Sequence, residues 1–200
     1  VIDQWITTPT FDFLSGYHTG FEDLDEPIVH RRSLFYYKPN YWILCDLLTG
    51  EGQHFFDQYF HFPPFRLNVD FMNKRVDIET KQNRHFMLMP LNLHDLDVTI
   101  FTGGEKPESG WISGGYKKKV AASFIKYGKQ AIAPTSFHTL LYAYNEQHPL
   151  NLTGRPLQVF SQHGEPLLSH EVSAIEISGE QQETHYFVLL YQKHQFVTQI

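Results

Sequence analysis

The segment from residue 30 to residue 64 constrains the fold most, because it reads as three consecutive strands separated by two turns. Aromatic and other β-favouring residues fill it except at residues 38–40 and 49–52, where proline, asparagine and glycine favour turns. A pair of prolines ends the segment, because proline has no backbone N–H to donate to a sheet. The predicted strands are residues 32–37, 41–48 and 54–62.

The first turn also predicts how the first two strands pair. If Tyr37 faces Tyr41 across a three-residue turn, Arg32 lies directly opposite Asp46. The two side chains then form a cross-strand ion pair within an otherwise apolar meander. A two-residue turn would shift this pairing by one residue.

Other parts of the chain show the same strand periodicity. Apolar and polar residues alternate over residues 66–71 and 75–81, which predicts a hairpin with one solvated face. Residues 1–26 are less regular, and there we expect Trp5 and Phe13 to seal an edge of the core. Further strands are predicted at residues 86–89, 97–101, 121–127, 137–144, 157–162, 172–177 and 185–192.

These patterns together predict an all-β fold. About a dozen strands with short turns and no helical period favour a two-layer antiparallel β-sandwich. A chain of 200 residues can bury a sizeable core, so a single domain over residues 1–200 is the default expectation. Because the chain starts at Val1 without a methionine or an apolar leader, we expect it to be a C-terminal fragment of a longer multidomain protein.

The formal net charge of −6 argues against a nucleic-acid partner, which usually requires a basic face. A polyanionic ligand requires local clusters of lysine and arginine, and residues 31–32, 74–75 and 117–119 offer them, although each fits a solvated strand edge or loop as well. No apolar run approaches the roughly 20 residues that a membrane span needs. Cys45 is the single cysteine, which excludes an internal disulfide.

Histidine is frequent, with 12 in the chain, and His30, Asp46, His54 and His61 are the obvious candidates for a metal site. In one regular strand, however, His54 and His61 point to opposite faces because an odd number of positions separates them. The chain also lacks an H-x-H pair, the spacing with which one strand presents two ligands on one face. We therefore expect no metal site in this segment and interpret these histidines as strand residues hydrogen-bonded to their neighbours.

Several segments resemble, in their order along the chain, the C-terminal β-domain of the heparinase II/III family of polysaccharide lyases. The resemblance covers residues 11 to 145. It implies a β-sandwich that belongs to a lyase cleaving uronic-acid-containing polysaccharide by β-elimination. The matching segments are GYHTGF at residues 16–21, HRR at 30–32, YWILCD at 41–46, the H-x6-H strand at 54–61 that leads into FHFPP, GWIS at 110–113 and TLL at 139–141.

The resemblance also implies that the reactive groups lie elsewhere. In this family a helical toroid, N-terminal to the β-domain, supplies the catalytic Asn or His and Tyr. H-x-H-x-D and HN elements upstream of the matched region supply a β-domain histidine and the metal ligands. The chain has no counterpart of these motifs, so it carries over no catalytic residue and no metal ligand. A divalent metal in the full-length protein would be bound by residues upstream of Val1. The expected partners are acidic polysaccharide and the helical domain, and the expected compartment is periplasmic or secreted.

Six residues are candidates for contact with sugar or with the helical domain. Tyr17 and His18 face opposite ways in a strand, but both reach a cleft if Gly16 and Gly20 make this segment a loop. A guanidinium can bind a uronate carboxylate through two hydrogen bonds, although one of two adjacent arginines is expected to pair with Asp46. A tryptophan among glycines can stack on a sugar ring. The candidates are Tyr17, His18, His30, Arg31, Arg32 and Trp111.

The sequence leaves other readings open. A non-catalytic carbohydrate-binding module would bind glycan directly through exposed aromatic residues such as Trp111, and a structural module would not bind it. A core tyrosine at position 17 and a solvated histidine at position 18 fit the pattern as well as a cleft position does.

Overall fold

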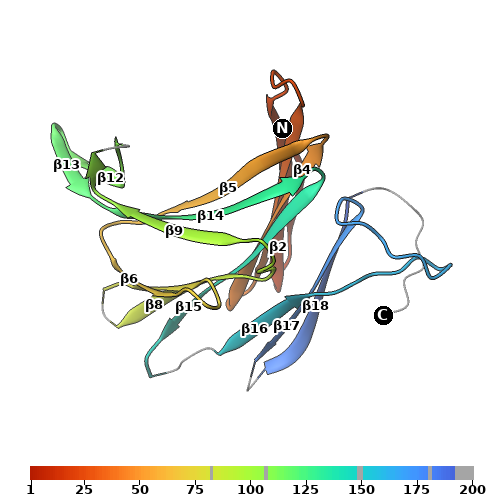
Figure 1. The fold of residues 1–200 in the computed structure, drawn as a ribbon. Coiled ribbons are helices and arrows are strands. Elements are labelled where there is room, and N and C mark those ends of the chain that lie inside the picture. The colour runs from red at the N-terminus through yellow and green to blue at the C-terminus, as the bar shows by residue number, and fades with distance from the viewer. Residues whose placement is uncertain (82, 106–107, 148–150, 180–181, 192–200) are drawn as a thin grey trace.

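The computed structural model describes residues 1–81, 83–105, 108–147, 151–179 and 182–191, which form strands and turns without a helix (Figure 1). Within these residues, therefore, no helix has the length and hydropathy to cross a membrane. The strands are β1 (Ile2–Thr7), β2 (Phe11–Phe21), β3 (Ile28–Tyr37), β4 (Tyr41–Gly50), β5 (Gln53–His61), β6 (Arg66–Asp70), β7 (Arg75–Glu79), β8 (Arg84–Pro90), β9 (Asp97–Thr102), β10 (Gly104–Glu105), β11 (Glu108–Ser109), β12 (Trp111–Gly115), β13 (Lys118–Ala121), β14 (Ser123–Ile132), β15 (Thr135–Asn145), β16 (Leu152–Pro156), β17 (Val172–Gly179) and β18 (Gln182–Leu190).

The largest sheet contains eight antiparallel strands in the order β1-β2-β3-β4-β15-β8-β7-β6. Its centre contains the first two strands of the predicted meander. Tyr37 pairs with Tyr41 across the turn, and Arg32 lies opposite Asp46 with Nε 2.6 Å from the carboxylate. The predicted register and the predicted ion pair are therefore confirmed, as is the hairpin of β6 and β7 at the sheet's far edge.

A three-stranded sheet, β5-β14-β9, covers one face of the large sheet. Phe56 of β5 and Ile125 and Tyr127 of β14 point inward and form a core with Val76 and Leu88 of the large sheet. Successive side chains of a strand point to opposite faces, so the residues between these inward positions face outward.

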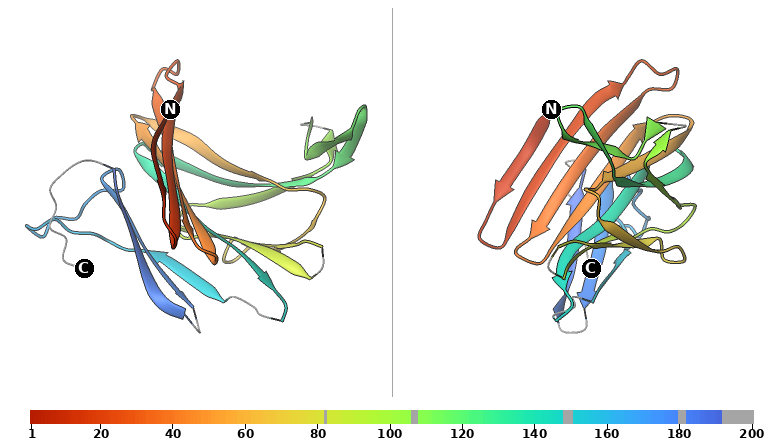
Figure 2. Two further views of the ribbon diagram at one scale, coloured as in Figure 1. Left: turned by 180° about the vertical axis from the view of Figure 1, so that it is seen from behind. Right: turned by 90° about the vertical axis from the view of Figure 1, so that its left-hand side faces the viewer.

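A second three-stranded sheet, β16-β17-β18, covers the opposite face of the large sheet (Figures 1 and 2). Ile175 of β17 packs there against Tyr41, Ile43 and Leu140. The chain is thus an all-β antiparallel sandwich, as predicted, with a third and smaller layer behind the two main ones. Because the large sheet buries both faces, β4 is buried at every position from Ile43 to Leu47, which explains its apolar sequence.

Three predictions in the first and last parts of the chain are wrong. Residues 1–26 are mostly regular, because β1 and β2 pair at the edge of the large sheet. Phe13 is buried there, but the side chain of Trp5 on the edge strand is 70% exposed and seals no part of the core. Residues 157–162 form only an isolated bridge at Phe160, because the ladder with β17 is made by β16, which ends at Pro156. The hairpin of β12 and β13 was not predicted, and residue 192 of the last predicted strand lies outside the described residues.

Candidate functional site

A groove of about 480 Å³ lies beside β5, the edge strand of its three-stranded sheet. Consecutive residues from His54 to Tyr59 line it, which places it along the edge of the strand and not over one face of it. The large sheet continues beyond this edge into β2 and β1 (Figure 2), and its inner face forms the floor with His30, Arg32 and Asp46. We call this cavity the β5 groove.

Asp46 is the buried centre of the floor, with 3% of its side chain exposed. Arg32 donates from Nε to Oδ1 at 2.6 Å and from Nη2 to Oδ2 at 2.7 Å. His30 donates from Nε2 to Oδ1 at 2.9 Å, and Gln58 donates from Nε2 to Oδ2 at 2.7 Å. Gln58 accepts in turn from the Thr139 hydroxyl at 3.0 Å. These five residues, the Asp46 network, join strands β3, β4, β5 and β15.

The network keeps Asp46 ionised. Burial raises the pKa of this carboxyl, but the hydrogen bonds from Arg32 and His30, the charge of Arg32 and the hydrogen bond from Gln58 outweigh burial and lower the pKa to about 2. An ionised carboxylate can only accept hydrogen bonds. Every neighbour must therefore donate to it, which assigns a proton to Nε2 of His30.

His18 extends this arrangement toward the surface. The backbone N–H of Gly20 donates to Nδ1 of His18 at 3.2 Å, which leaves the ring proton of His18 on Nε2, and Nε2 donates to Nδ1 of His30 at 3.0 Å. Both nitrogens of both rings are engaged. His18 consequently positions His30 and retains no ring nitrogen for a ligand.

Arg32 presents the unused edge of its guanidinium to the β5 groove. Its Nε and Nη2 are bound to Asp46, whereas Nη1 makes no hydrogen bond with the described residues. Half of the side chain, 51%, is exposed. Nη1 therefore keeps its N–H donors for an anionic ligand, and Asp46 holds the guanidinium in one orientation.

Tyr17 and Arg31 lie on the other face of the large sheet. This segment is strand β2 and not a loop, so Tyr17 points away from the groove. Arg31 forms an ion pair with Asp3 at 2.6 Å and donates to Ser15 at 3.1 Å, and its guanidinium lies 5.3 Å from the centre of the Tyr17 ring. The two predicted arginines thus serve different faces, with Arg32 at the β5 groove.

Trp111 lies in a second cavity. This cavity of about 700 Å³ is on the outward face of the β5-β14-β9 sheet, where the β12–β13 hairpin begins. Nε1 of Trp111 donates to the carbonyl oxygen of Gly104 at 2.9 Å, and Nζ of Lys119 lies 4.2 Å from the ring centre. Tyr59 and His61 line both cavities, so the two are adjacent.

Three of the four residues considered as metal ligands use their nitrogen or oxygen atoms in other hydrogen bonds. Both carboxylate oxygens of Asp46 accept from N–H donors, and His30 uses its protonated Nε2 for one of them. Nε2 of His54 bonds the carbonyl of Glu51 at 2.9 Å. In the described ranges of the chain, no three or more His, Cys, Asp or Glu residues are grouped as a metal site requires.

Sequence reasoning did not predict Gln58 and Thr139 as members of the network. A signal was present for Gln58, which occupies an inward position of β5 between Phe56 and Phe60, because a polar residue at a core position must find a buried partner. Thr139 is separated from Gln58 by 81 positions, and only the packing of the two sheets brings them together.

Comparison with known proteins gives a family and a fold. Residues 8–165 match the family described as heparinase II/III-like, C-terminal. No curated protein sequence matches the chain. The crystal structure of heparan sulfate lyase HepC from Pedobacter heparinus matches with a TM-score of 0.76 at 15% identity, over 98% of this chain and 28% of that one.

Two solved structures of heparinase III match in the same way. Their TM-scores are 0.74 and 0.71 at 12% and 13% identity, and each match covers 95% of this chain and 27% of the other. At such identities the matches show a shared fold. The chain spans little more than a quarter of the length of these solved proteins.

Proposed function

The chain belongs to the heparinase II/III-like family, whose C-terminal domain it matches, and from this premise we propose that it forms one wall of the substrate cleft of a polysaccharide lyase. This lyase cleaves uronic-acid-containing polysaccharide by β-elimination. Residues 1–200 are its C-terminal β-domain, and a helical domain N-terminal to them forms the rest of the cleft. The fold shared with HepC and heparinase III over about a quarter of their length supports this arrangement.

β-Elimination places a definite demand on the cleft. A base removes the proton at C5 of the uronate, the electron pair forms the C4–C5 double bond, and the C4–O glycosidic bond breaks as an acid protonates the leaving oxygen. Negative charge builds on the uronate carboxylate as the C5–H bond breaks. A fixed positive charge beside that carboxylate therefore lowers the barrier.

The observation that carries the proposal is the exposed guanidinium edge of Arg32 above the buried, ionised Asp46. We assign to Arg32 the binding and neutralisation of a uronate carboxylate. Asp46 orients Arg32, and His18 and His30 support Asp46. We assign the base, the acid and any divalent metal to residues outside this chain, as the family resemblance implies.

The test uses the full-length protein with heparan sulfate and with alginate, following the ultraviolet absorbance of the unsaturated product. Arg32→Gln removes the positive charge, and kcat/KM is expected to fall by about 100-fold or more. Arg32→Lys keeps the charge but loses the planar guanidinium, so its kcat/KM is expected to lie between those of the wild type and Arg32→Gln. Arg66→Gln, on the remote edge strand β6, is the matched control and is expected to keep wild-type activity.

Circular dichroism must show that each variant is folded, because Arg32 also supports the Asp46 network. A full-length protein that releases no unsaturated product from any uronate polymer contradicts the proposal. A folded Arg32→Gln variant as active as the Arg66→Gln control removes its central residue.

A further inference from the structure

We propose that the outward face of the β5-β14-β9 sheet is a second saccharide-binding surface, which holds an acidic polysaccharide chain where it leaves the β5 groove. The nature of this ligand rests on the proposed function. We call the surface the outer platform. Its side chains are Tyr59, His61, Phe101, Trp111, Phe124 and Lys126.

The register of the sheet assembles the aromatic rings. Phe124 of β14 lies opposite His61 of β5 on one side and opposite Phe101 of β9 on the other. The rings of Phe101 and Phe124 stack at 4.9 Å with an interplanar angle of 19°, and His61 lies 5.3 Å from Phe124. Tyr59 continues the row at 47% exposure. Tyr59 and His61 are the exposed members of this row, whereas Phe101 is half-buried and Phe124, at 7% exposure, is buried.

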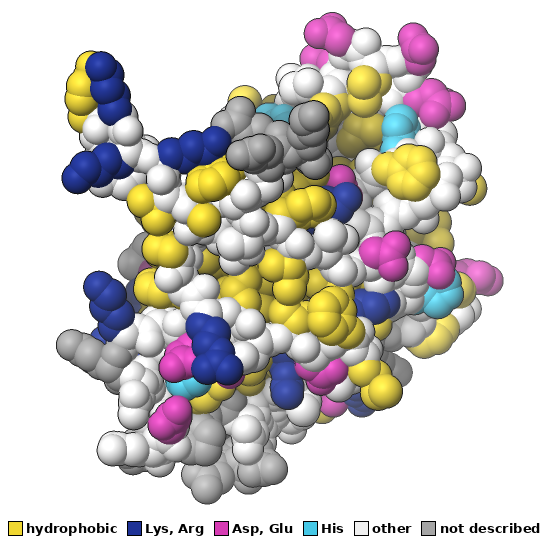
Figure 3. Space-filling model, turned by 60° about the vertical axis from the view of Figure 1, so that its left-hand side comes forward, with side chains coloured by type: hydrophobic (Ala, Val, Ile, Leu, Met, Phe, Trp, Pro, Cys, Tyr) yellow, Lys and Arg dark blue, Asp and Glu magenta, His cyan; other side chains and the backbone are white. Residues whose placement is uncertain are grey.

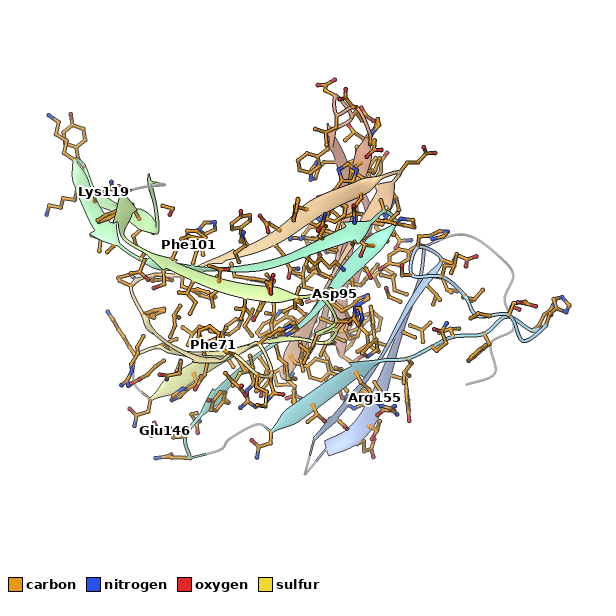
Figure 4. All side chains as sticks on the ribbon, viewed as in Figure 1. Phe71, Asp95, Phe101, Lys119, Glu146 and Arg155 are labelled. Atoms are coloured by element: carbon orange, nitrogen blue, oxygen red, sulfur yellow. The ribbon has the colours of Figure 1, made fainter. Side chains whose placement is uncertain are left out.

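The β12–β13 hairpin projects from the sheet at one end of this row of rings. Figure 4 shows Lys119 on the hairpin where it rises from the end of β9, and Phe101 on β9 itself. The base of the hairpin is tight at Gly110, where φ is +75° and an added Cβ would lie 2.6 Å from the backbone nitrogen of Gly103. The hydrogen bond from Trp111 to Gly104 fixes the indole ring within the platform.

Several lysines lie at the end of the outer platform that is next to the β12–β13 hairpin. Residues 117–119 at the hairpin turn are all lysine, and Lys126 lies on the platform, where Asp57 is 3.4 Å away. The acidic run at residues 22–26 belongs to the turn between β2 and β3. Along the upper margin of Figure 3, Lys and Arg side chains lie at the left and Asp and Glu side chains at the right, with hydrophobic side chains between them. A polyanion is therefore drawn toward the hairpin, although the chain as a whole is acidic.

These features fit an acidic saccharide. The exposed rings of Tyr59 and His61 and the half-buried rings of Phe101 and Trp111 offer apolar surfaces to the C–H faces of sugar rings. Lysines at the rim offer partners to carboxylate or sulfate groups. Tyr59 and His61 line both the β5 groove and the platform, so a polymer with one uronate at Arg32 continues directly onto the rings. The outer platform is thus a set of subsites for the part of the polymer beyond the cleavage point.

Binding to the 200-residue chain tests this directly, with heparan sulfate oligosaccharides of defined length and isothermal titration calorimetry. Trp111→Ala and Tyr59→Ala are each expected to weaken the binding of long oligosaccharides by about fivefold to tenfold. Lys126→Gln is expected to weaken it less at high salt than at low salt. Trp5→Ala is the matched control, because Trp5 is exposed on β1 and belongs to neither cavity.

The outcomes separate this inference from the proposed function. In the full-length enzyme Trp111→Ala, which lies outside the β5 groove, is expected to raise KM for long chains and leave turnover of the shortest substrate unchanged. Arg32→Gln is expected to lower kcat/KM for long and short substrates alike. An active enzyme whose platform variants bind long chains as the Trp5→Ala control does overturns the platform and leaves the lyase intact. Protection of Lys119 and Lys126 from amine labelling in the ligand-free full-length protein would show that another domain covers this face, which also overturns it.

Discussion

Two carboxylate–histidine clusters lie on opposite faces of the eight-stranded sheet and are built differently. On the inner face, Asp46 accepts from an arginine, a glutamine and a histidine, and 3% of its side chain is exposed. On the other face, Asp77 of β7 accepts from Nδ1 of His85 at 3.1 Å and from the Tyr144 hydroxyl at 2.9 Å. The side chain of Asp77 is 24% exposed and has no lysine or arginine partner among the described residues.

The difference shows what a carboxylate requires at each depth. Asp46 lies beneath β5, where water cannot compensate its charge, and a guanidinium from the neighbouring strand does so. Asp77 keeps contact with solvent, so neutral donors suffice. Burial and the hydrogen bond to Asp77 raise the pKa of Tyr144, which therefore stays protonated and donates. The inner cluster thus contains an arginine bound to its carboxylate, and the free edge of that arginine faces the β5 groove.

The largest expected difference between the two clusters is in the free energy of unfolding that is lost when each carboxylate is removed. Asp46→Ala leaves the charge of Arg32 and the amide of Gln58 without their partner. Loss of one member of a buried ion pair costs about 3–5 kcal/mol, and because Arg32 is half exposed we expect about 3 kcal/mol. Asp77→Ala removes a partly solvated acceptor and should cost about 1–2 kcal/mol. Urea denaturation followed by circular dichroism measures both.

Asp57→Ala is the control for this pair of variants. It removes a carboxylate whose ion pair with Lys126 is at the surface, so the free energy of unfolding should change by about 0.5 kcal/mol or less. Equal losses at Asp46 and Asp77 would break the comparison, because depth of burial would then not decide the cost.

The inner cluster could be predicted in part from the sequence, and the outer one could not. The pairing of Arg32 with Asp46 follows from one short turn between adjacent strands, which the residues themselves indicate. Tyr144 reaches Asp77 only because β15 and β7 both flank β8, an arrangement that local periodicity does not contain. Alternation correctly placed Asp77 on the face of the sheet that Val76 and Ile78 do not occupy. It could not show that Tyr144 lies on the same face as Asp77.

The same limit applies to the candidate site. The sequence predicted His18, His30 and Arg32, which the strand register brings to one face. It did not separate Arg31 from Arg32, because that requires knowing which face the second sheet covers. The position of Trp111 likewise depends on the β12–β13 hairpin, which was not predicted.

Protonation of Asp46 at low pH should lower the stability of the protein by less than the Asp46→Ala substitution does. The pKa of Asp46 is lowered to about 2, below its ordinary value of 3.8, so its stabilisation is present above about pH 4 and is lost as pH falls toward 2. A shift of this size corresponds to about 2 kcal/mol. Asp46→Asn should abolish this step in the free energy of unfolding, measured by urea denaturation between pH 7 and pH 2.

A second group provides the internal control for that titration. Burial and the charge of Lys129 lower the pKa of His138 to about 4, against a smaller opposing effect of Asp46. The unfolded chain binds this proton near pH 6.5 and the folded chain resists it, so stability falls as pH drops from about 6.5 to 4. This step should remain in Asp46→Asn. An Asp46→Asn variant that still loses stability between pH 4 and pH 2 as steeply as the wild type does would assign the acid step to other groups.

The smallest expected effects come from removing one hydroxyl on each side. Tyr144→Phe deprives Asp77 of a donor that water can replace, and we expect a loss of about 0.5–1 kcal/mol. Thr139→Val leaves the carbonyl oxygen of Gln58 unpaired in a fully buried position and should cost about 1–2 kcal/mol. Both substitutions preserve shape, so the urea midpoints compare the hydrogen bonds directly. A larger loss for Tyr144→Phe than for Thr139→Val would mean that solvent does not reach Asp77, and the outer cluster would then be the more demanding of the two.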